Sequence, residues 1–273
     1  MALYDDIGHD YDRTRKVDSF ILNKFIEHLN ANESNHYLEI GCGTGNYLIG
    51  MIERGYTNIV GLDPSELMLN QAREKCRIKD IKREPNSWIR CYAENTPFLS
   101  DSFDGVFCIH ALHHFAKGKR ASIFNLVFHI LRNGGRFVIF TNTHDQIDRY
   151  WLNYYFPKAM NTLKRYTPDM KVLIPELEVA GFKIIKNEPY YISENLNDLF
   201  LYSKKHEPKA YLEESFRNNM SLFKVKATDR EEIKKGLKLL KADCSTGKIY
   251  NIINKFEYND TNLGDYLFIV CEK

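Results

Sequence analysis

The chain has 273 residues, of which 44% are hydrophobic and 27% are charged, and its formal net charge is +2. This length allows one large domain, or one domain with a sizeable insertion. Because the net charge is near zero and no apolar stretch reaches the length of a membrane span, neither a dedicated nucleic-acid binder nor a membrane protein is expected.

The cysteine pattern and the first residues favour a reduced, soluble, cytoplasmic protein. No two cysteines form a CxxC pair, so a structural zinc site is not expected. The six positions are Cys42, Cys76, Cys91, Cys108, Cys244 and Cys271. The opening sequence MALYDDIGHDYDR lacks the apolar segment of a signal peptide.

The first half of the chain alternates short apolar runs with helical patterns, which is typical of βαβ units and a parallel sheet. Helices are predicted over 46–54, from Pro64-Ser65 onward and over 120–131. Gly55 suits a helix C-cap, and Pro64 suits the first turn of the second helix. Strands are predicted over 36–40, 58–63, 88–93, 103–109 and, after a turn at 133–135, 136–141.

The pattern changes after residue 142, so we divide the chain into a core over 1–142 and a second part over 143–273. The second part is expected to complete the sheet with strands over about 182–191 and 265–272. Helices are predicted over 145–170, 175–180 and, in several pieces, 195–241, with a capped start at Thr228-Asp229. Two insertions, at about 145–175 and 193–250, are expected to cover the same end of the sheet.

A glycine-rich turn lies between the first strand and the first helix, in YLEIGCGTGN at 37–46. Its glycines let the backbone approach a ligand closely. A dinucleotide site prefers G-x-G-x-x-G and a pyrophosphate at the helix N-terminus, which Glu39 would repel. Glu39 instead suits the amino group of S-adenosylmethionine (SAM), directly or through water. The alternative is a tight turn that binds no ligand.

Asp63 ends the second predicted strand. In a doubly wound sheet this position lies beside the ribose of a nucleotide bound at the first turn, where a carboxylate accepts both hydroxyl protons. The alternative role is a helix N-cap, which Asp63 or Ser65 can fill. The two roles are compatible.

Five motifs in order resemble the class I SAM-dependent methyltransferases, and within them the small-molecule and quinone-biosynthesis (methyltransferase type 11) group. They are LEIGCGTGNY, GLDPSELML, CYAENTPF, DSFDGVFCIHALHHF and LRNGGRFVIF, and the resemblance covers residues 4–141. It implies an α/β fold with a doubly wound, Rossmann-like, mostly parallel seven-stranded sheet, an antiparallel last strand and helical lid insertions. It also implies SAM as cofactor and S-adenosylhomocysteine as product.

The resemblance assigns further cofactor contacts. Met68 matches the residue that packs on adenine, and Ala93 and Glu94 match the loop at the adenine edge, where Tyr92 replaces the usual Asp. Tyr4 and Tyr11 resemble an aromatic lid, and Arg15 either reaches the methionine carboxylate or lies on a solvated helix. The predicted cofactor-binding residues are Tyr11, Arg15, Glu39, Gly41, Cys42, Gly43, Asp63, Pro64, Met68, Ala93, Glu94 and His110.

Three histidines, His110, His113 and His114, follow the fourth strand at spacings that can share a helical face. Three hypotheses are open for them. They bind a metal ion; or one of them acts as a base or orients the acceptor; or His110 contributes backbone contacts to SAM while the other two pack locally. No metal is expected, because methyl transfer from a sulfonium does not need one. His113 is the catalytic candidate, since its position in related phosphobase methyltransferases pairs with a lid tyrosine.

The acceptor is left open by the sequence. Aromatic residues over 151–156 interleave with Lys158, Lys164 and Arg165, which forms either an aromatic, cationic pocket or a lid with buried aromatics and solvated cations. Lys234, Lys235, Lys238 and Lys241 are most simply a solvated face. We expect methyl transfer to a small-molecule O, N, S or C nucleophile. The alternatives are RNA or tRNA methylation and a non-catalytic SAM-binding regulator; the oligomeric state is not predicted.

Overall fold

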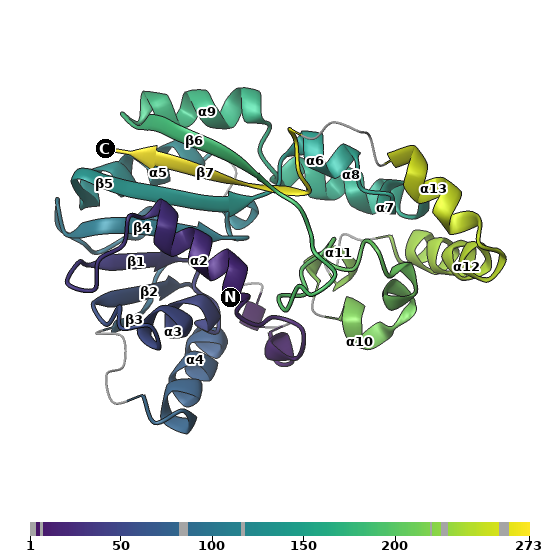
Figure 1. Ribbon diagram of the computed structural model, residues 1–273, viewed down its shortest axis with the longest axis horizontal. Helices are drawn as coiled ribbons and strands as arrows, with labels where there is room; N and C mark the ends of the chain where they lie inside the picture. Colours follow the sequence, from purple (N-terminus) through teal and green to yellow (C-terminus); the bar gives the residue numbers. More distant parts are fainter. Residues whose placement is uncertain are drawn as a thin grey trace.

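Seven strands form one sheet in the computed structural model (Figure 1), which describes residues 4–5, 8–81, 87–115, 118–218, 220–224, 229–256 and 262–273. The strand order is β3-β2-β1-β4-β5-β7-β6. β7 runs antiparallel to both β5 and β6, and the other neighbouring pairs are parallel. The predicted fold class is therefore confirmed. The strands are β1 Tyr37–Ile40, β2 Ile59–Asp63, β3 Ser87–Arg90, β4 Phe103–Ile109, β5 Leu131–Thr141, β6 Lys183–Tyr190 and β7 Tyr266–Glu272.

Helices cover both faces of the sheet because its central strands are apolar on both sides. On one face, α2 (Ser19–His28), α3 (Asn46–Ile52) and α4 (Glu66–Ile78) share a buried cluster with strand residues such as Phe107 and Phe140. On the other face, α5 (Arg120–Ile130) and α9 (Met170–Val179) bury a second cluster with strand residues such as Val106 and Ile139. Each burial removes apolar surface from water, which is the main force that holds these layers together.

A second group of helices lies beyond the carboxyl ends of the parallel strands (Figure 1). Within it α12 packs on α7, α13 and η4, and α11 packs on α8. No helix among the described residues is long and apolar enough to cross a membrane. The group comprises α6 His144–Asp148, α7 Leu152–Tyr155, α8 Pro157–Tyr166, η4 Pro208–Leu212, α10 Glu214–Arg217, α11 Ser221–Lys224, α12 Arg230–Thr246 and α13 Lys248–Phe256.

Several predicted boundaries are wrong for identifiable reasons. Pro64 precedes α4 instead of lying in its first turn, because the Ser65 side chain accepts the Met68 N–H and is the N-cap. The predicted helix over 145–170 is broken into α6, α7 and α8, with Pro157 starting the last piece. Helix α9 begins at Met170, well before the predicted start, and contains Pro175.

Other differences are local. β3 ends at Arg90, and Ala93 lies in the short helix η2 (Ala93–Asn95). The turn at 133–135 is an irregularity inside β5, where Gly134 adopts a positive φ of 75°. Asp229 is the N-cap of α12, while Thr228, which we placed in the same cap, lies outside the described residues.

Candidate functional site

The glycine-rich turn after β1 has the backbone that its sequence predicts. Gly41, Gly43 and Gly45 have φ values of 73°, 54° and 72°, which are left-handed conformations that L side chains rarely adopt. A Cβ at Gly41 would lie 2.4 Å from the Cβ of Ala111, so this turn has no room for a side chain. At Gly43 the nearest neighbours of a Cβ are the side chains of Met68 and Tyr11, at 3.3 and 3.9 Å. The turn therefore exposes bare backbone to the space between those two side chains.

Asp63, the last residue of β2, is oriented by the same turn. Its Oδ2 accepts the Gly43 N–H at 2.9 Å, and its Oδ1 accepts the Ser65 N–H at 2.9 Å. Burial raises the pKa of this carboxyl, and the two backbone donors act in the opposite direction. A buried acceptor fixed by two N–H groups is suited to bind hydroxyl donors of a ligand. The helix N-cap, in contrast, is Ser65.

A cavity of about 290 Å³ opens at the carboxyl ends of β1, β2 and β4. This is the point where the strand order reverses direction, which is where open α/β sheets bind nucleotides. We call it the cofactor cavity. Predicted site residues that line it are Tyr11, Gly41, Gly43, Asp63, Pro64, Met68, Ala93, Glu94 and His110, and it is also lined by Tyr4, Tyr92, Ser65, His114 and Phe115.

Three predicted cofactor residues do not line this cavity: Glu39, Cys42 and Arg15, the last of which is described below. Glu39 is 2% exposed, accepts the Leu48 backbone N–H, and has one carboxylate oxygen without a hydrogen-bond partner among the described residues. Burial raises the pKa of Glu39 well above its ordinary value. The Cys42 side chain is buried, 2.9 Å from the point that a Cβ on Gly61 would occupy. Both side chains are buried and neither lines the cavity, so their contact with a cofactor stays a prediction.

The N-terminal segment closes over the glycine turn through a polar cluster. The Thr44 hydroxyl donates to Asp12 at 2.6 Å, and the Lys75 ammonium contacts Asp12, Thr44 and Asn46. Tyr4 and Tyr11 meet edge to face, with ring centroids 5.6 Å apart. This cluster holds both rings in the wall of the cofactor cavity, where the resemblance predicts an aromatic lid.

Arg15 is bound by a residue that sequence reasoning did not identify. Its guanidinium makes a two-pronged contact with Asp198, at 2.5 and 3.0 Å, and donates to the Tyr11 hydroxyl at 2.9 Å. Asp198 is fully buried and also accepts from the Tyr47 hydroxyl at 3.0 Å. Asp198 holds the pKa of Arg15 well above its ordinary value. Arg15 therefore joins the N-terminal segment to the second insertion, and it does not line the cofactor cavity.

The histidines after β4 separate into different environments. The His113 and His114 rings contact each other within η3 (Leu112–His114), with centroids 3.9 Å apart and planes tilted by 47°. The lid tyrosine Tyr4 pairs with His114, at 3.2 Å from hydroxyl to Nε2, and this differs from the predicted pairing with His113. Desolvation and the nearby Arg15 lower the pKa of His114 to about 4, and that of His113 falls well below its ordinary value. Both rings are therefore neutral near pH 7.

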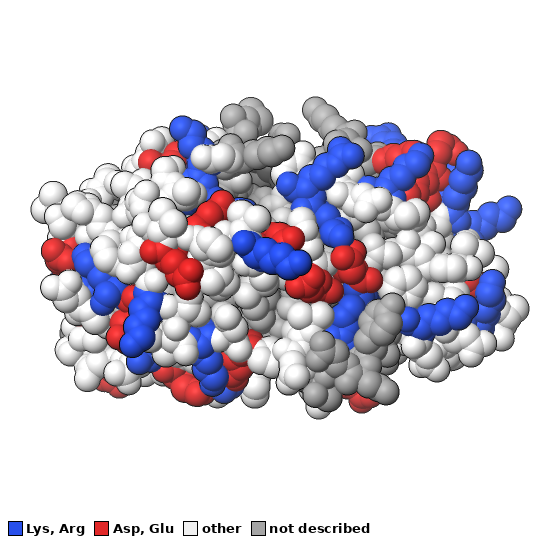
Figure 2. Space-filling model, turned by 90° about the horizontal axis from the view of Figure 1, so that it is seen from above, with Lys and Arg blue, Asp and Glu red and all other residues white. Residues whose placement is uncertain are grey.

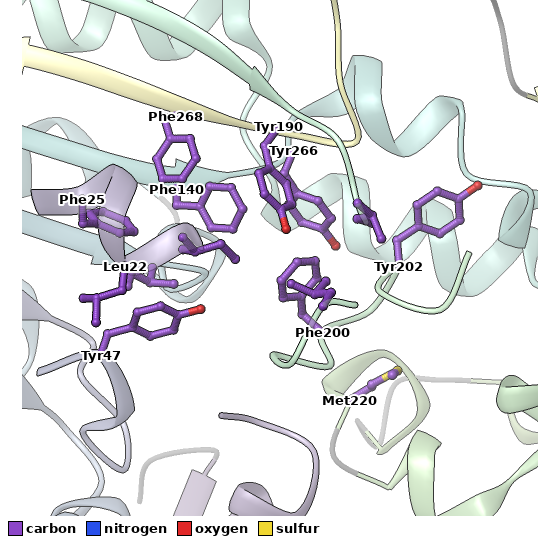
Figure 3. Packing of buried hydrophobic residues seen from close by; sticks show 14 of the residues in the cluster. Leu22, Phe25, Tyr47, Phe140, Tyr190, Phe200, Tyr202, Met220, Tyr266 and Phe268 are labelled. Carbon is purple, nitrogen blue, oxygen red and sulfur yellow. The ribbon is translucent and has the colours of Figure 1, made fainter. Parts of the chain in front are cut away.

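A second cavity, of about 70 Å³, adjoins the first, and Tyr4 and His110 line both. We call it the acceptor cavity. Besides Tyr4 and His110, the polar residues Arg15, His113 and Asn142 also line the acceptor cavity. Figure 3 shows Phe200 facing Tyr266, with Met220 beyond them on a separate segment. The remaining wall is largely apolar and comes mainly from the second insertion, through Leu163, Phe200, Leu201, Met220, Ser221, Leu222 and Tyr266.

The aromatic residues of the first insertion do not form a ligand pocket. Trp151 and Phe156 are fully buried, Tyr155 is 3% exposed, and none lines either cavity. Lys158 pairs with Asp229 and Lys164 with Asp148 on the surface. Of the two interpretations, the lid with buried aromatics agrees with the structure. The residues that form the apolar wall of the acceptor cavity were missed because they carry no motif. Asn142 was missed as well, although its position directly after the fifth strand made it identifiable.

The cofactor cavity fits the parts of SAM. Asp63 presents a fixed carboxylate for ribose hydroxyls, the side chains of Met68, Ala93 and Phe115 offer an apolar wall for a base, and Tyr4 and Tyr11 present aromatic rings that suit a sulfonium. Because Gly43 has no side chain, a ligand can approach its backbone in the space beside Met68 and Tyr11. Among the described residues no three His, Cys, Asp or Glu side chains are placed to hold a metal ion.

Comparisons with known proteins agree with this geometry. Residues 38–135 match a family model described as a methyltransferase domain. The chain is similar to tRNA U34 carboxymethyltransferases: 30% identical over 126 residues to that of Shewanella halifaxensis, covering 43% of this chain and 34% of that protein. It is 27% identical over 171 residues to the enzyme of Mannheimia succiniciproducens, and that match covers 61% of this chain and 51% of that protein. The chain thus spans a third to a half of the length of these curated relatives.

Several solved structures match nearly the whole chain. One of them is a putative methyltransferase from an antibiotic biosynthesis pathway of Anabaena variabilis, with 27% identity and a TM-score of 0.79. The match covers 95% of this chain and 99% of that one. Coverage of this extent necessarily includes most of the two helical insertions.

Proposed function

We propose that this chain, which belongs to the class I SAM-dependent methyltransferases, transfers a methyl group from SAM to a small-molecule acceptor held in the acceptor cavity. The observation that carries the proposal is the pair of adjoining cavities that share Tyr4 and His110. One has the groups that suit SAM, and the other is small and combines a polar edge with an apolar wall. Such a pair lets two reactants meet in a fixed orientation.

The residues act mainly by positioning and by excluding water. When bound, SAM supplies a methyl group that is already activated by its sulfonium sulfur. Asp63 would hold the ribose end, and Tyr4 and Tyr11, which line the same cavity, would present their rings to the sulfonium. The second insertion lines the acceptor cavity with apolar side chains, which would limit the access of water to the reacting atoms. His113, our sequence-based catalytic candidate, borders this cavity, and a direct role for it stays a proposal.

The comparison with the Anabaena protein supports a small-molecule acceptor. That protein is described with an antibiotic biosynthesis pathway, and its similarity extends over the insertions that build the acceptor cavity. The match to the S. halifaxensis tRNA-modifying enzyme covers less than half of this chain. Substrate choice depends on the insertions rather than on the shared cofactor half, so the longer match carries more weight.

Calorimetric titration with SAM, S-adenosylhomocysteine and NAD tests the cofactor half of the proposal. We expect micromolar binding of the first two and none of NAD. Binding of NAD would contradict the proposal. The proposal would also be contradicted if none of the three compounds binds, either alone or in the presence of a panel of small phenols and amines. Turnover of SAM with one class of small molecule in the same panel would then identify the acceptor.

Transfer to tRNA is the second candidate, because the curated relatives modify tRNA. Figure 2 shows acidic and basic side chains interspersed, with several basic ones at the end formed by α12 and α13. Lys234, Lys235, Lys238 and Lys241 of α12 are exposed, and none has an ion-pair partner among the described residues. These lysines are the contacts that we would expect to meet phosphates.

Filter binding of total tRNA over a range of salt concentrations separates the two candidates. An RNA substrate predicts affinity that falls steeply with salt, with a slope of about −0.7 to −0.9 per phosphate contact. Replacing the four α12 lysines by glutamine should then reduce that slope, whereas replacing Lys171 and Lys183, exposed cations elsewhere, should not. Absence of salt-dependent retention would leave the small-molecule acceptor.

A further inference from the structure

His110 occupies the boundary between the two cavities and is held there by its backbone and its ring. Its φ of 49° lies in the left-handed region, which is uncommon for residues other than glycine, and its N–H donates to the Phe140 carbonyl at 3.0 Å. The ring packs on Phe140, Phe200 and Tyr266, with centroid distances of 4.8, 4.3 and 5.0 Å. A strained backbone in a functional cleft is a feature that the surrounding fold must maintain.

The Nε2 atom of this ring is buried and has no hydrogen-bond partner among the described residues. A buried polar atom is normally paired, and each exception in a native structure requires an explanation. The ring is neutral near pH 7, because desolvation and the nearby Arg15 hold the pKa of His110 well below its ordinary value. A neutral imidazole offers one nitrogen as an acceptor and one as a donor. A ligand in the adjoining cavity is a natural partner for the open nitrogen.

The charge in the acceptor cavity is already balanced. Arg15 is the cationic side chain in its described wall, and the buried Asp198 neutralises it through a two-pronged contact. The carboxylate of an anionic acceptor would be desolvated next to this closed ion pair and to neutral histidines, which is unfavourable. The apolar wall of Leu163, Phe200 and Met220 accommodates an uncharged ring.

We propose that the acceptor is a compact, uncharged molecule that carries an O–H or N–H, and that Nε2 of His110 accepts a hydrogen bond from that group. This inference rests on the proposed methyl transfer and narrows its acceptor. His110 is thereby a catalytic residue, whereas the sequence left three roles open for the histidines, with His113 as the candidate base and backbone contacts as one role for His110.

The chemistry of the step balances without a further reactant. A lone pair of the acceptor oxygen or nitrogen forms the new bond to the methyl carbon, while the carbon–sulfur bond breaks and leaves its electron pair on sulfur. The proton of the O–H or N–H moves to Nε2 of His110. The imidazolium that forms releases the proton once the methylated product has left and water reaches the ring, which restores the neutral imidazole. The positive charge that begins on the sulfonium thus leaves as this proton.

Nitrogen-15 NMR of the histidine rings tests the inference on the full chain saturated with S-adenosylhomocysteine. The probes are phenol, anisole and benzoate, which share a ring and differ as an uncharged donor, an uncharged ring without a donor, and an anion. We expect phenol to shift the Nε2 resonance of His110 and to bind at least tenfold more tightly than anisole or benzoate. An unshifted resonance with saturating phenol, or preference for benzoate, would overturn the inference.

Variants provide a second readout. His110→Phe should reduce the phenol preference over anisole to about twofold or less when both ligands are compared at saturating S-adenosylhomocysteine, so that a change in cofactor affinity does not enter the comparison. His129→Phe, an exposed histidine on α5, is the matched control and should retain the preference. If the Phe variant does not fold, His110→Asn replaces it in this test, because asparagine tolerates the left-handed backbone. If the wild-type protein fails to bind S-adenosylhomocysteine, the proposed function fails; if it binds but ignores phenol, this inference alone fails.

Discussion

Replacing Asp63 by alanine tests how the cofactor cavity works. Both oxygens of this carboxylate already accept backbone N–H groups at 2.9 Å, and the side chain is 8% exposed. A ribose that donates two hydroxyls to it would lose a charged acceptor in the variant. Removing one partner of a charged hydrogen bond costs about 1–3 kcal/mol. We therefore expect SAM to bind about 5- to 150-fold more weakly, since about 1.4 kcal/mol corresponds to tenfold.

The assay must separate lost binding from a loosened turn. Calorimetry gives the affinity for SAM and S-adenosylhomocysteine, and urea unfolding without ligand gives the stability of each variant. Asp63→Asn retains the shape and one carbonyl oxygen, so its loss should be smaller. Asp104→Ala is the matched control, because Asp104 also accepts a backbone N–H, from His36, but lies at the other end of the sheet. An Asp63→Ala affinity within twofold of wild type would refute the role that we assign to this carboxylate.

Three further predictions concern stability. Gly41→Ala should lower the free energy of unfolding by more than about 3 kcal/mol, because it combines a left-handed backbone with a 2.4 Å approach to Ala111. Gly134→Ala is the control, since Gly134 has a similar φ but open space around it, and it should cost only about 1–2 kcal/mol in urea unfolding. Asp198→Ala should cost about 3–5 kcal/mol because it leaves Arg15 buried without its partner, and a cost below 1 kcal/mol would contradict this. Glu39 has a pKa raised by burial, so the stability that it contributes is full below about pH 4.3 and is lost as pH rises through its folded-state pKa. Glu39→Gln should therefore melt at a higher temperature than wild type near pH 8 and show a flatter profile from about pH 5 to 8; parallel profiles would show that Glu39 does not titrate in this range.

The cofactor half was predictable because its constraints are local. The spacing of Gly41, Gly43 and Gly45 requires positive φ values directly after a strand, and Asp63 ends the next strand. Neighbouring parallel strands bring such residues to one edge of the sheet, whatever the rest of the chain does. The helix breaks within 145–170 were only partly predictable, since Pro157 marks the start of α8 but no proline or glycine separates α6 from α7.

The acceptor half depended on contacts between residues far apart in the sequence. Asp198 neutralises Arg15 across 183 positions, and Tyr4 reaches His114 across 110 positions. No spacing rule relates such pairs, because their meeting depends on how the insertion folds back over the sheet. The sequence by itself determined the fold class, the SAM-type turn and the carboxylate of Asp63, since these follow from periodicity and backbone sterics. Only the tertiary structure decided that His110 and His113 line the acceptor cavity while His114 does not, because ring environment and burial arise when the insertion packs against the end of β4.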